Sequence, residues 1–182
     1  MERRKALKFT ATILGGSIIG SHVFLSGCSA LKKKSKLLTD DDLSLLDEIS
    51  ETILPDSDQS PGAKTAHIGE FMKTMVNYCY NLEETNIFIK GLETIDKSAN
   101  IAYGEVFIDL SANQRFELLS KFDLDAKKSR LLKKLHFFTM MKELVILGYF
   151  TSKPGATKAL RYNPIPERYE GCIPYNGETS WV

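Results

Sequence analysis

The residues of this chain that could do chemistry are few and lie far apart. After the first thirty residues there are two histidines, His67 and His136, and neither belongs to a spacing typical of a zinc or haem site. His136 stands beside Phe137 and Phe138, which favours a histidine in or next to the core over a metal ligand. The sequence has neither a glycine-rich phosphate loop nor a nucleophile elbow. Residue spacing therefore predicts no catalytic site, no metal and no cofactor in this chain.

Two carboxylates lie in a turn-rich segment, Pro55–Ala63, between apolar stretches. Asp56 and Asp58 could bind a hard cation together with backbone carbonyls, but two acids are fewer than calcium prefers. Aspartate also closes turns through its own side chain, and the prolines and glycine of this segment are typical of a shaped turn. We therefore expect both residues to order the loop.

Three cysteines offer different chemistry. Cys28 ends the sequence Leu25-Ser26-Gly27-Cys28, which looks like a lipobox, where lipoprotein signal peptidase cuts before a lipid-modified cysteine. The alternative is an ordinary small residue at the end of a signal anchor. Cys79 and Cys172 then remain, and a disulfide between them is permitted in an oxidising compartment. Cys79 also falls on an apolar helical face and could instead be a buried thiol.

The first 27 residues have the layout of a secretory signal. A basic start is followed by an apolar stretch, Phe9–Leu25, which glycine, serine and threonine make too weak for a permanent transmembrane helix. The adjacent Arg3 and Arg4 resemble the twin-arginine consensus. We predict a twin-arginine lipoprotein signal at 1–27, a lipidated polar tether at 28–38 and a helical domain at 39–182. The chain would then be an exported, membrane-anchored lipoprotein on the periplasmic side of a bacterial envelope.

Charge argues against a nucleic-acid partner. Without the leader's four basic residues and one acidic residue, 20 basic and 22 acidic residues remain among 155. That length suits one domain with a sizeable core. The basic run Lys32–Lys36 follows the predicted lipid site, where we favour a solvated spacer with a weak contact to anionic head groups.

Helical periodicity runs through the middle of the chain and predicts an all-α fold, a single irregular bundle with a long non-regular C-terminal segment. Thr39 with three following aspartates predicts a helix start, and Pro55 ends that helix at Leu54. The apolar face of that helix is Leu43, Leu46, Ile49 and Ile53. Later helices are predicted by three further apolar faces: Ile68, Phe71, Met72, Met75, Val76 and Cys79; Phe88, Leu92, Ile95 and Ala99; and, after a capping box of Ser111 with Gln114, Phe116, Leu119 and Phe122.

The most apolar stretch, Ser129–Leu147, predicts a central helix with Gly148 as its C-cap. Only Glu105–Ile108 could be a short extended piece. From Tyr149 to Val182 no helical period is visible, yet the segment holds many aromatic and aliphatic residues, in which disordered tails are poor. We expect this tail to be ordered by packing, either on its own bundle or on another chain.

Three stretches of the sequence are similar to a known family. They are Glu51–Ala63, Lys142–Ser152, and Ala159–Pro166 continued by Tyr169–Pro174. Their sequences, ETILPDSDQSPGA, KELVILGYFTS, ALRYNPIP and YEGCIP, make the chain resemble gluconate 2-dehydrogenase subunit 3, the small subunit of membrane-bound flavin-dependent sugar and sugar-acid dehydrogenases. The resemblance spans about Leu43 to Pro174.

The resemblance implies an accessory role. In such complexes the large subunit carries FAD and performs the oxidation, a cytochrome can pass the electrons on, and the small subunit, itself without catalytic residues, carries the export signal for its folded partner. We expect the loops that face this partner to be shaped by Pro55, Asp56, Pro61, Gly62, Tyr149, Arg161, Tyr162 and Tyr169. The alternative is a self-sufficient ligand-binding lipoprotein or enzyme with a pocket in its bundle.

Overall fold

The computed structural model describes residues 37–165, 172 and 174–180. The predicted signal residues Arg3 and Arg4 and the predicted lipidation site Cys28 lie outside these residues. The described helices are α2 (Leu43–Ile53), α3 (Ile68–Tyr78), α4 (Leu82–Tyr103), α5 (Ala112–Leu131) and α6 (Phe137–Thr151), with the short 3-10 turns η1 (Asp40–Asp42) and η2 (Phe107–Asp109) and the π-helical turn η3 (Gly155–Ala159).

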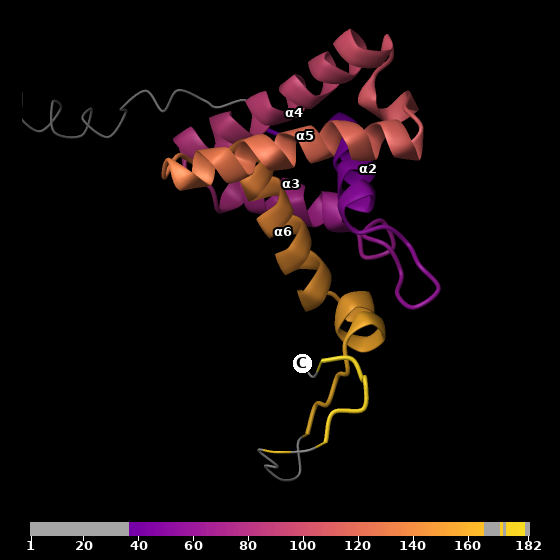
Figure 1. Cartoon of the computed structure of the whole chain (residues 1–182). Helices are drawn as coiled ribbons and strands as arrows, with labels where there is room; N and C mark the ends of the chain where they lie inside the picture. Colours follow the sequence, from indigo (N-terminus) through magenta and orange to yellow (C-terminus); the bar gives the residue numbers. More distant parts are fainter. Residues whose placement is uncertain (1–36, 166–171, 173, 181–182) are drawn as a thin grey trace, which may run out of the picture. The chain divides into compact units, whose positions relative to one another are not determined.

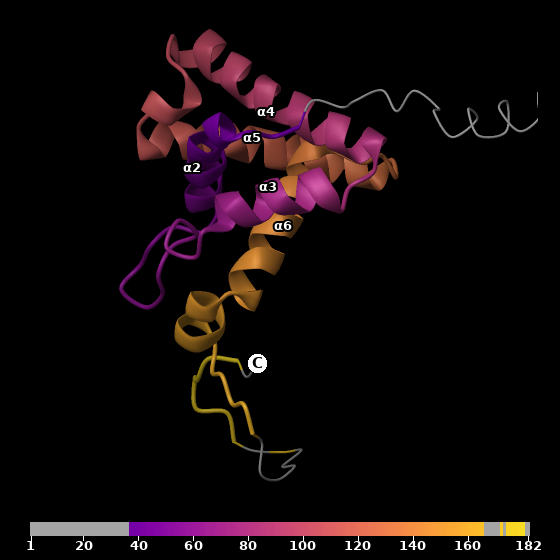
Figure 2. The same ribbon diagram turned by 180° about the vertical axis from the view of Figure 1, so that it is seen from behind.

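The fold is all-α, as predicted, and the part of the chain that the structure describes contains no strand. Within that part, every helix is too short or too polar to cross a membrane. Figures 1 and 2 show α6 running from among α3, α4 and α5 toward the C-terminal segment. The helix contacts α2, α3, α4 and α5, so it is the central helix of the bundle.

Most of the core consists of the apolar faces expected from the sequence, and Phe107 of η2 adds to it. Its largest fully buried side chains are Phe88, Phe107, Leu46, Ile49, Ile68, Met72, Ile95, Met141, Val76 and Val145. Two helix starts are capped by side chains, and the second of them was expected from the sequence. Asn81 accepts hydrogen bonds from the amides of Glu83 and Glu84, and Ser111 forms the predicted capping box with Gln114.

The prediction of one continuous helix over Ser129–Leu147 is wrong. A turn interrupts this stretch, because α5 ends at Leu131 and α6 begins at Phe137. The amides of Lys133 and Lys134 donate to the carbonyls of Arg130 and Ser129, 3.0 Å each, and Lys133 has a left-handed φ of 55°. This is a Schellman ending, and because it uses lysine where glycine is usual, nothing in the sequence signals it.

Gly148, predicted to be a C-cap, is buried inside α6. A Cβ there would lie 2.5 Å from the Phe71 ring, so the missing side chain lets α3 and α6 approach. The helix continues to Thr151 and is followed by η3, so the non-regular segment begins later than predicted. Its described residues beyond Arg161 are exposed, so the described part of the tail does not wrap its own bundle.

Other predictions about single residues also fail. Phe116, expected to face inward, is 65% exposed, and Cys79, expected on an apolar face, is exposed at the end of α3. Cys79 and Cys172 are both exposed free thiols in the structure. The stretch considered as extended, Glu105–Ile108, instead leads into η2.

Candidate partner interface

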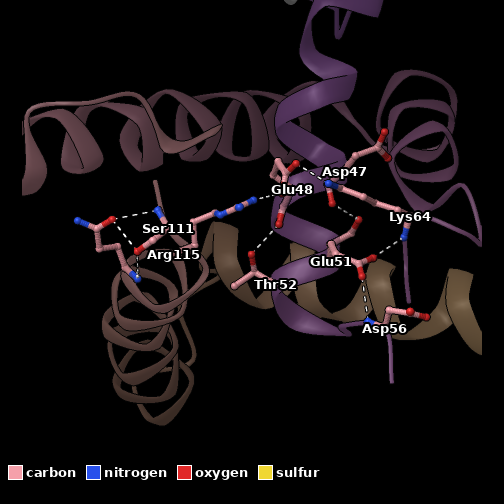
Figure 3. A network of polar contacts seen from close by, with 10 residues as sticks. Asp47, Glu48, Glu51, Thr52, Asp56, Lys64, Ser111 and Arg115 are labelled. Carbon is pink, nitrogen blue, oxygen red and sulfur yellow. Dashed lines mark hydrogen bonds and ion pairs between the residues drawn. The ribbon is translucent and has the colours of Figure 1, made fainter. Parts of the chain in front are cut away.

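The loop between α2 and α3, residues 55–63 (the Pro–Gly loop), is closed by a carboxylate from the helix before it. Glu51 Oε1 accepts the amide of Asp56 at 2.9 Å, and Oε2 accepts the amide of Lys64 at 2.8 Å (Figure 3). One side chain thus holds both ends of the loop. A Cβ on Gly62 would lie 2.2 Å from this carboxylate, so glycine is required for the close approach.

Inside the loop, side chains accept hydrogen bonds from backbone amides. Asp56 Oδ1 accepts the amide of Gly62 at 3.0 Å, which confirms its expected turn role. Ser57 and Ser60 close a tighter turn through reciprocal backbone hydrogen bonds of 3.0 and 3.3 Å. Asp58 is exposed at the tip. The Pro–Gly loop is therefore ordered by its own hydrogen bonds and has a defined shape.

Tyr149 connects this loop to the end of α6. Its side chain is 3% exposed, and its hydroxyl donates to the carbonyl of Pro61 at 2.5 Å. The contact joins residues 88 apart in the sequence. Because Tyr149 is buried, it can shape the loop but cannot itself be an exposed contact residue.

A charged network lies behind the loop. Glu48 on α2 forms ion pairs with both Lys64 and Arg115, which brings α5 against α2 (Figure 3). Beside it, burial raises the pKa of the Asp47 carboxyl, although the amide of Gly69 and the charge of Lys64 act in the opposite direction.

A groove of about 420 Å³ lies between α2, α5 and α6. Its walls are mainly apolar, and its charged groups form one cluster in which Asp123 pairs with Lys127 at 2.8 Å and with Lys142 at 2.6 Å. Hydrogen bonds from these two lysines hold the pKa of Asp123 below its ordinary value. The remaining lining residues are Thr52, Ile53, Phe116, Leu119, Ser120, Leu124 and Phe138.

The histidines are not brought together by the fold. His136 is half-buried at the start of α6, where its Nδ1 accepts the amide of Phe138 at 3.2 Å, and burial lowers its pKa. It is thus the boundary residue that the sequence predicts. Among the described residues there is no group of three or more side chains that could hold a metal.

The C-terminal segment carries exposed apolar side chains. The amide of Arg161 donates to the carbonyl of Ser180 at 2.8 Å, and its guanidinium pairs with Glu178 at 2.6 Å, so two stretches of this segment lie side by side. Three apolar side chains nearby are largely exposed: Tyr162 at 56%, Ile165 at 75% and Tyr175 at 81%. Such side chains are common in the centres of protein–protein contacts.

The predicted interface residues therefore fall into two groups. Asp56, Pro61, Gly62 and Tyr149 come together and order the Pro–Gly loop, with Pro55 exposed at its start. The other group, Arg161 and Tyr162, belongs to the C-terminal segment, and Tyr169 lies outside the described residues.

Sequence reasoning did not single out the residues that hold the loop from behind, Glu51, Glu48, Lys64 and Arg115. A partial signal was present, because Glu51 stands on the last turns of a helix directly before a proline-rich loop. Its partner amide thirteen residues away could only be found in the structure.

Comparison with known families shows which family the chain belongs to. The family model for gluconate 2-dehydrogenase subunit 3 matches residues 40–166. The chain belongs to the gluconate 2-dehydrogenase subunit 3 family. No curated protein and no solved structure gives a significant match.

The match to the subunit 3 family covers every described helix, the Pro–Gly loop and the start of the C-terminal segment. The stretches from which the resemblance was drawn fall inside it, except for Tyr169–Pro174. Membership is consistent with an accessory subunit that associates with a larger dehydrogenase complex.

Proposed function

We propose that this chain is the non-catalytic small subunit of an exported FAD-dependent dehydrogenase, and that it docks, escorts and tethers the catalytic subunit. The observation that carries the proposal is the match to the gluconate 2-dehydrogenase subunit 3 family over residues 40–166, which is consistent with an accessory subunit of an oxidoreductase. FAD belongs to the partner in this proposal, and a cytochrome is a further possible subunit.

The docking surface in this proposal combines the Pro–Gly loop with the C-terminal segment. The loop is held by Glu51, Asp56 and Tyr149, so it can bind without first being ordered. The C-terminal segment supplies the exposed Tyr162, Ile165 and Tyr175, whose burial on a partner is favourable.

Export and anchoring complete the proposal. A noncovalently bound flavin must be inserted before export, and the twin-arginine route carries folded cargo, so Arg3 and Arg4 would serve the whole complex. Lipid on Cys28 would keep it at the membrane of the cell envelope. Replacing both arginines by lysine should leave the partner's flavin in the cytoplasm, and Cys28→Ser should abolish incorporation of labelled palmitate.

Co-purification tests docking. The chain isolated from its native membrane should carry a flavin-absorbing protein, and Tyr162→Ser/Ile165→Ser/Tyr175→Ser should lose it without changing the thermal unfolding of the chain. Tyr78→Ser/Ile101→Ser removes side chains that are 84% and 86% exposed on other elements and is the matched control. Purification of the chain without a flavoprotein, or equal retention by both variants, would refute this docking surface.

The groove favours a second candidate, a ligand-binding lipoprotein. It combines apolar walls with the Asp123, Lys127 and Lys142 side chains. This candidate requires a small molecule to co-purify with the isolated chain, and native mass spectrometry of that chain distinguishes the two candidates.

A further inference from the structure

The turn between α5 and α6 is unusual in composition. Residues 127–135 read Lys-Lys-Ser-Arg-Leu-Leu-Lys-Lys-Leu, with five basic residues, three leucines and no acid (the Lys–Leu turn). Leu131 is 86% exposed, Leu132 is 68% exposed and Leu135 is 52% exposed. Single exposed leucines are ordinary, but three within five residues form a local apolar surface.

The positive charges of the turn are only partly used within the fold. Lys127 pairs with Asp123 and Lys128 with Asp125, and both lysines remain largely exposed. Arg130, Lys133 and Lys134 are exposed and form no ion pair with any residue that the structure describes. Basic residues at a helix end do favour the helix dipole, yet that explains only the charges. The exposed leucines among them need another account.

The backbone holds these leucines outward. The Schellman ending closes α5 through the amides of Lys133 and Lys134. The left-handed φ of Lys133 disfavours the folded state roughly fivefold relative to glycine at this position. In this ending an apolar residue often follows the left-handed position and packs back on the helix. Here that residue is Lys134, so no such apolar contact covers the turn.

We propose that the Lys–Leu turn binds the surface of an anionic lipid bilayer, with its leucines inserted between head groups and its lysines and arginine paired with lipid phosphates. The charge complementarity favours lipid over protein, because the surface combines apolar tips with five cations and no acid, and the long stems of these cations can extend toward head groups. The contact requires neither the flavoprotein partner nor the predicted lipid on Cys28.

The position of the Lys–Leu turn permits a membrane contact there and a partner contact at the Pro–Gly loop at the same time. Figures 1 and 2 show the α5–α6 connection at the end of α5 that lies away from the Pro–Gly loop. A membrane on one side would leave the loop open to a partner. The turn would then fix the orientation of the domain at a membrane, which a flexible tether alone does not do.

A fluorophore placed in the turn tests insertion directly. The full chain, with Cys28, Cys79 and Cys172 replaced by serine, receives an environment-sensitive label at Leu132→Cys. The control carries the label at Ile101→Cys, an 86% exposed position on α4. Because any binding through the leader is common to both proteins, a difference between the labels reports on the turn.

Vesicles of phosphatidylcholine with phosphatidylglycerol should shift the emission at position 132 to shorter wavelength and reduce its quenching by iodide severalfold. Vesicles of pure phosphatidylcholine should cause neither change, and the label at position 101 should respond to neither kind of vesicle. Each basic residue at an anionic surface strengthens partitioning by roughly fivefold, so Lys133→Glu/Lys134→Glu should weaken the effect by more than tenfold, whereas Lys90→Glu/Lys97→Glu on α4 should change it little.

Two results would overturn the proposal. The first is a label at position 132 that stays as accessible to iodide as the label at position 101 in the presence of anionic vesicles. The second is a label that is insensitive to vesicles but becomes protected when the flavoprotein partner is added, which would make the turn a protein contact. Neither result bears on whether the Pro–Gly loop docks that partner, so the two proposals fail separately.

Discussion

The Pro–Gly loop and the Lys–Leu turn are ordered in opposite ways. Side chains from inside the molecule hold the loop, with Glu51 at both of its ends and Tyr149 at Pro61. Backbone hydrogen bonds from Lys133 and Lys134 close the Lys–Leu turn, and its apolar side chains are exposed. The loop uses proline and glycine where the backbone requires them, whereas the turn has a lysine in a glycine conformation.

This difference indicates what each segment contributes. A loop fixed by its own core has a shape that a rigid protein surface can match. In the Lys–Leu turn, the left-handed Lys133 carries a conformational cost that glycine would avoid, which agrees with a role for this lysine outside the fold. The following substitutions test whether the two segments differ in this way.

The largest effect should come from Gly62→Ala. The new Cβ would lie 2.2 Å from the Glu51 carboxylate and 2.7 Å from the backbone nitrogen of Asp56, so the loop must move. We expect a loss of about 3 kcal/mol in the free energy of unfolding, measured by urea denaturation. Gly104→Ala is the control: no atom lies near its Cβ, and only its positive φ costs about 1 kcal/mol. Equal losses would show that the loop is loosely held.

Glu51→Gln should have the next largest effect, because it weakens the hydrogen bonds that hold the two ends of the Pro–Gly loop. The neutral amide removes the charge from two hydrogen bonds and can accept only one of them well, at a cost of about 2 kcal/mol. Hydrogen exchange at the amides of Asp56 and Lys64 should accelerate more than exchange in the helices. The exposed Glu105→Gln should leave both measurements unchanged. Unaltered exchange at Asp56 and Lys64 would contradict the clamp.

Tyr149→Phe removes one hydroxyl and measures how much the hydrogen bond from α6 contributes to holding the Pro–Gly loop. Loss of the bond to Pro61 should cost about 1 kcal/mol in thermal unfolding, because the carbonyl is left without this donor. Tyr103→Phe is matched, since its hydroxyl bonds to the exposed Glu117 at 3.2 Å, and it should cost less than about 0.5 kcal/mol. If the two variants behave alike, Tyr149 does not anchor the loop.

The same comparison explains what could be read from the sequence. Helix faces and capping boxes follow local rules, so the bundle, most of its core and the helix start at Ser111 could be predicted. Asp56 could be assigned to a turn because aspartate does this locally. The segment Pro55–Ala63 was recognisable as a loop for the same reason.

The remaining features depend on contacts that local rules do not describe. The break after Leu131 has neither glycine nor proline, so periodicity continues through it. Gly148 serves helix packing against Phe71, which no single helix reveals. The burial of Tyr149 and the exposure of Phe116 are set by which helices meet, and the Glu51 clamp joins distant amides.

The smallest effect, and the only gain in stability, should come from Lys133→Gly. Glycine relieves a left-handed conformation that costs lysine about 1 kcal/mol, partly offset by the greater freedom of glycine in the unfolded chain, so we expect a gain of about 0.5 kcal/mol. Lys134→Gly loses the same charge without a positive φ to relieve and should not stabilise the fold. Both variants should bind anionic vesicles roughly fivefold more weakly. Stability and membrane binding would then change in opposite directions in Lys133→Gly alone, whereas a stabilised variant with unchanged binding would leave the strained lysine without a role at the membrane.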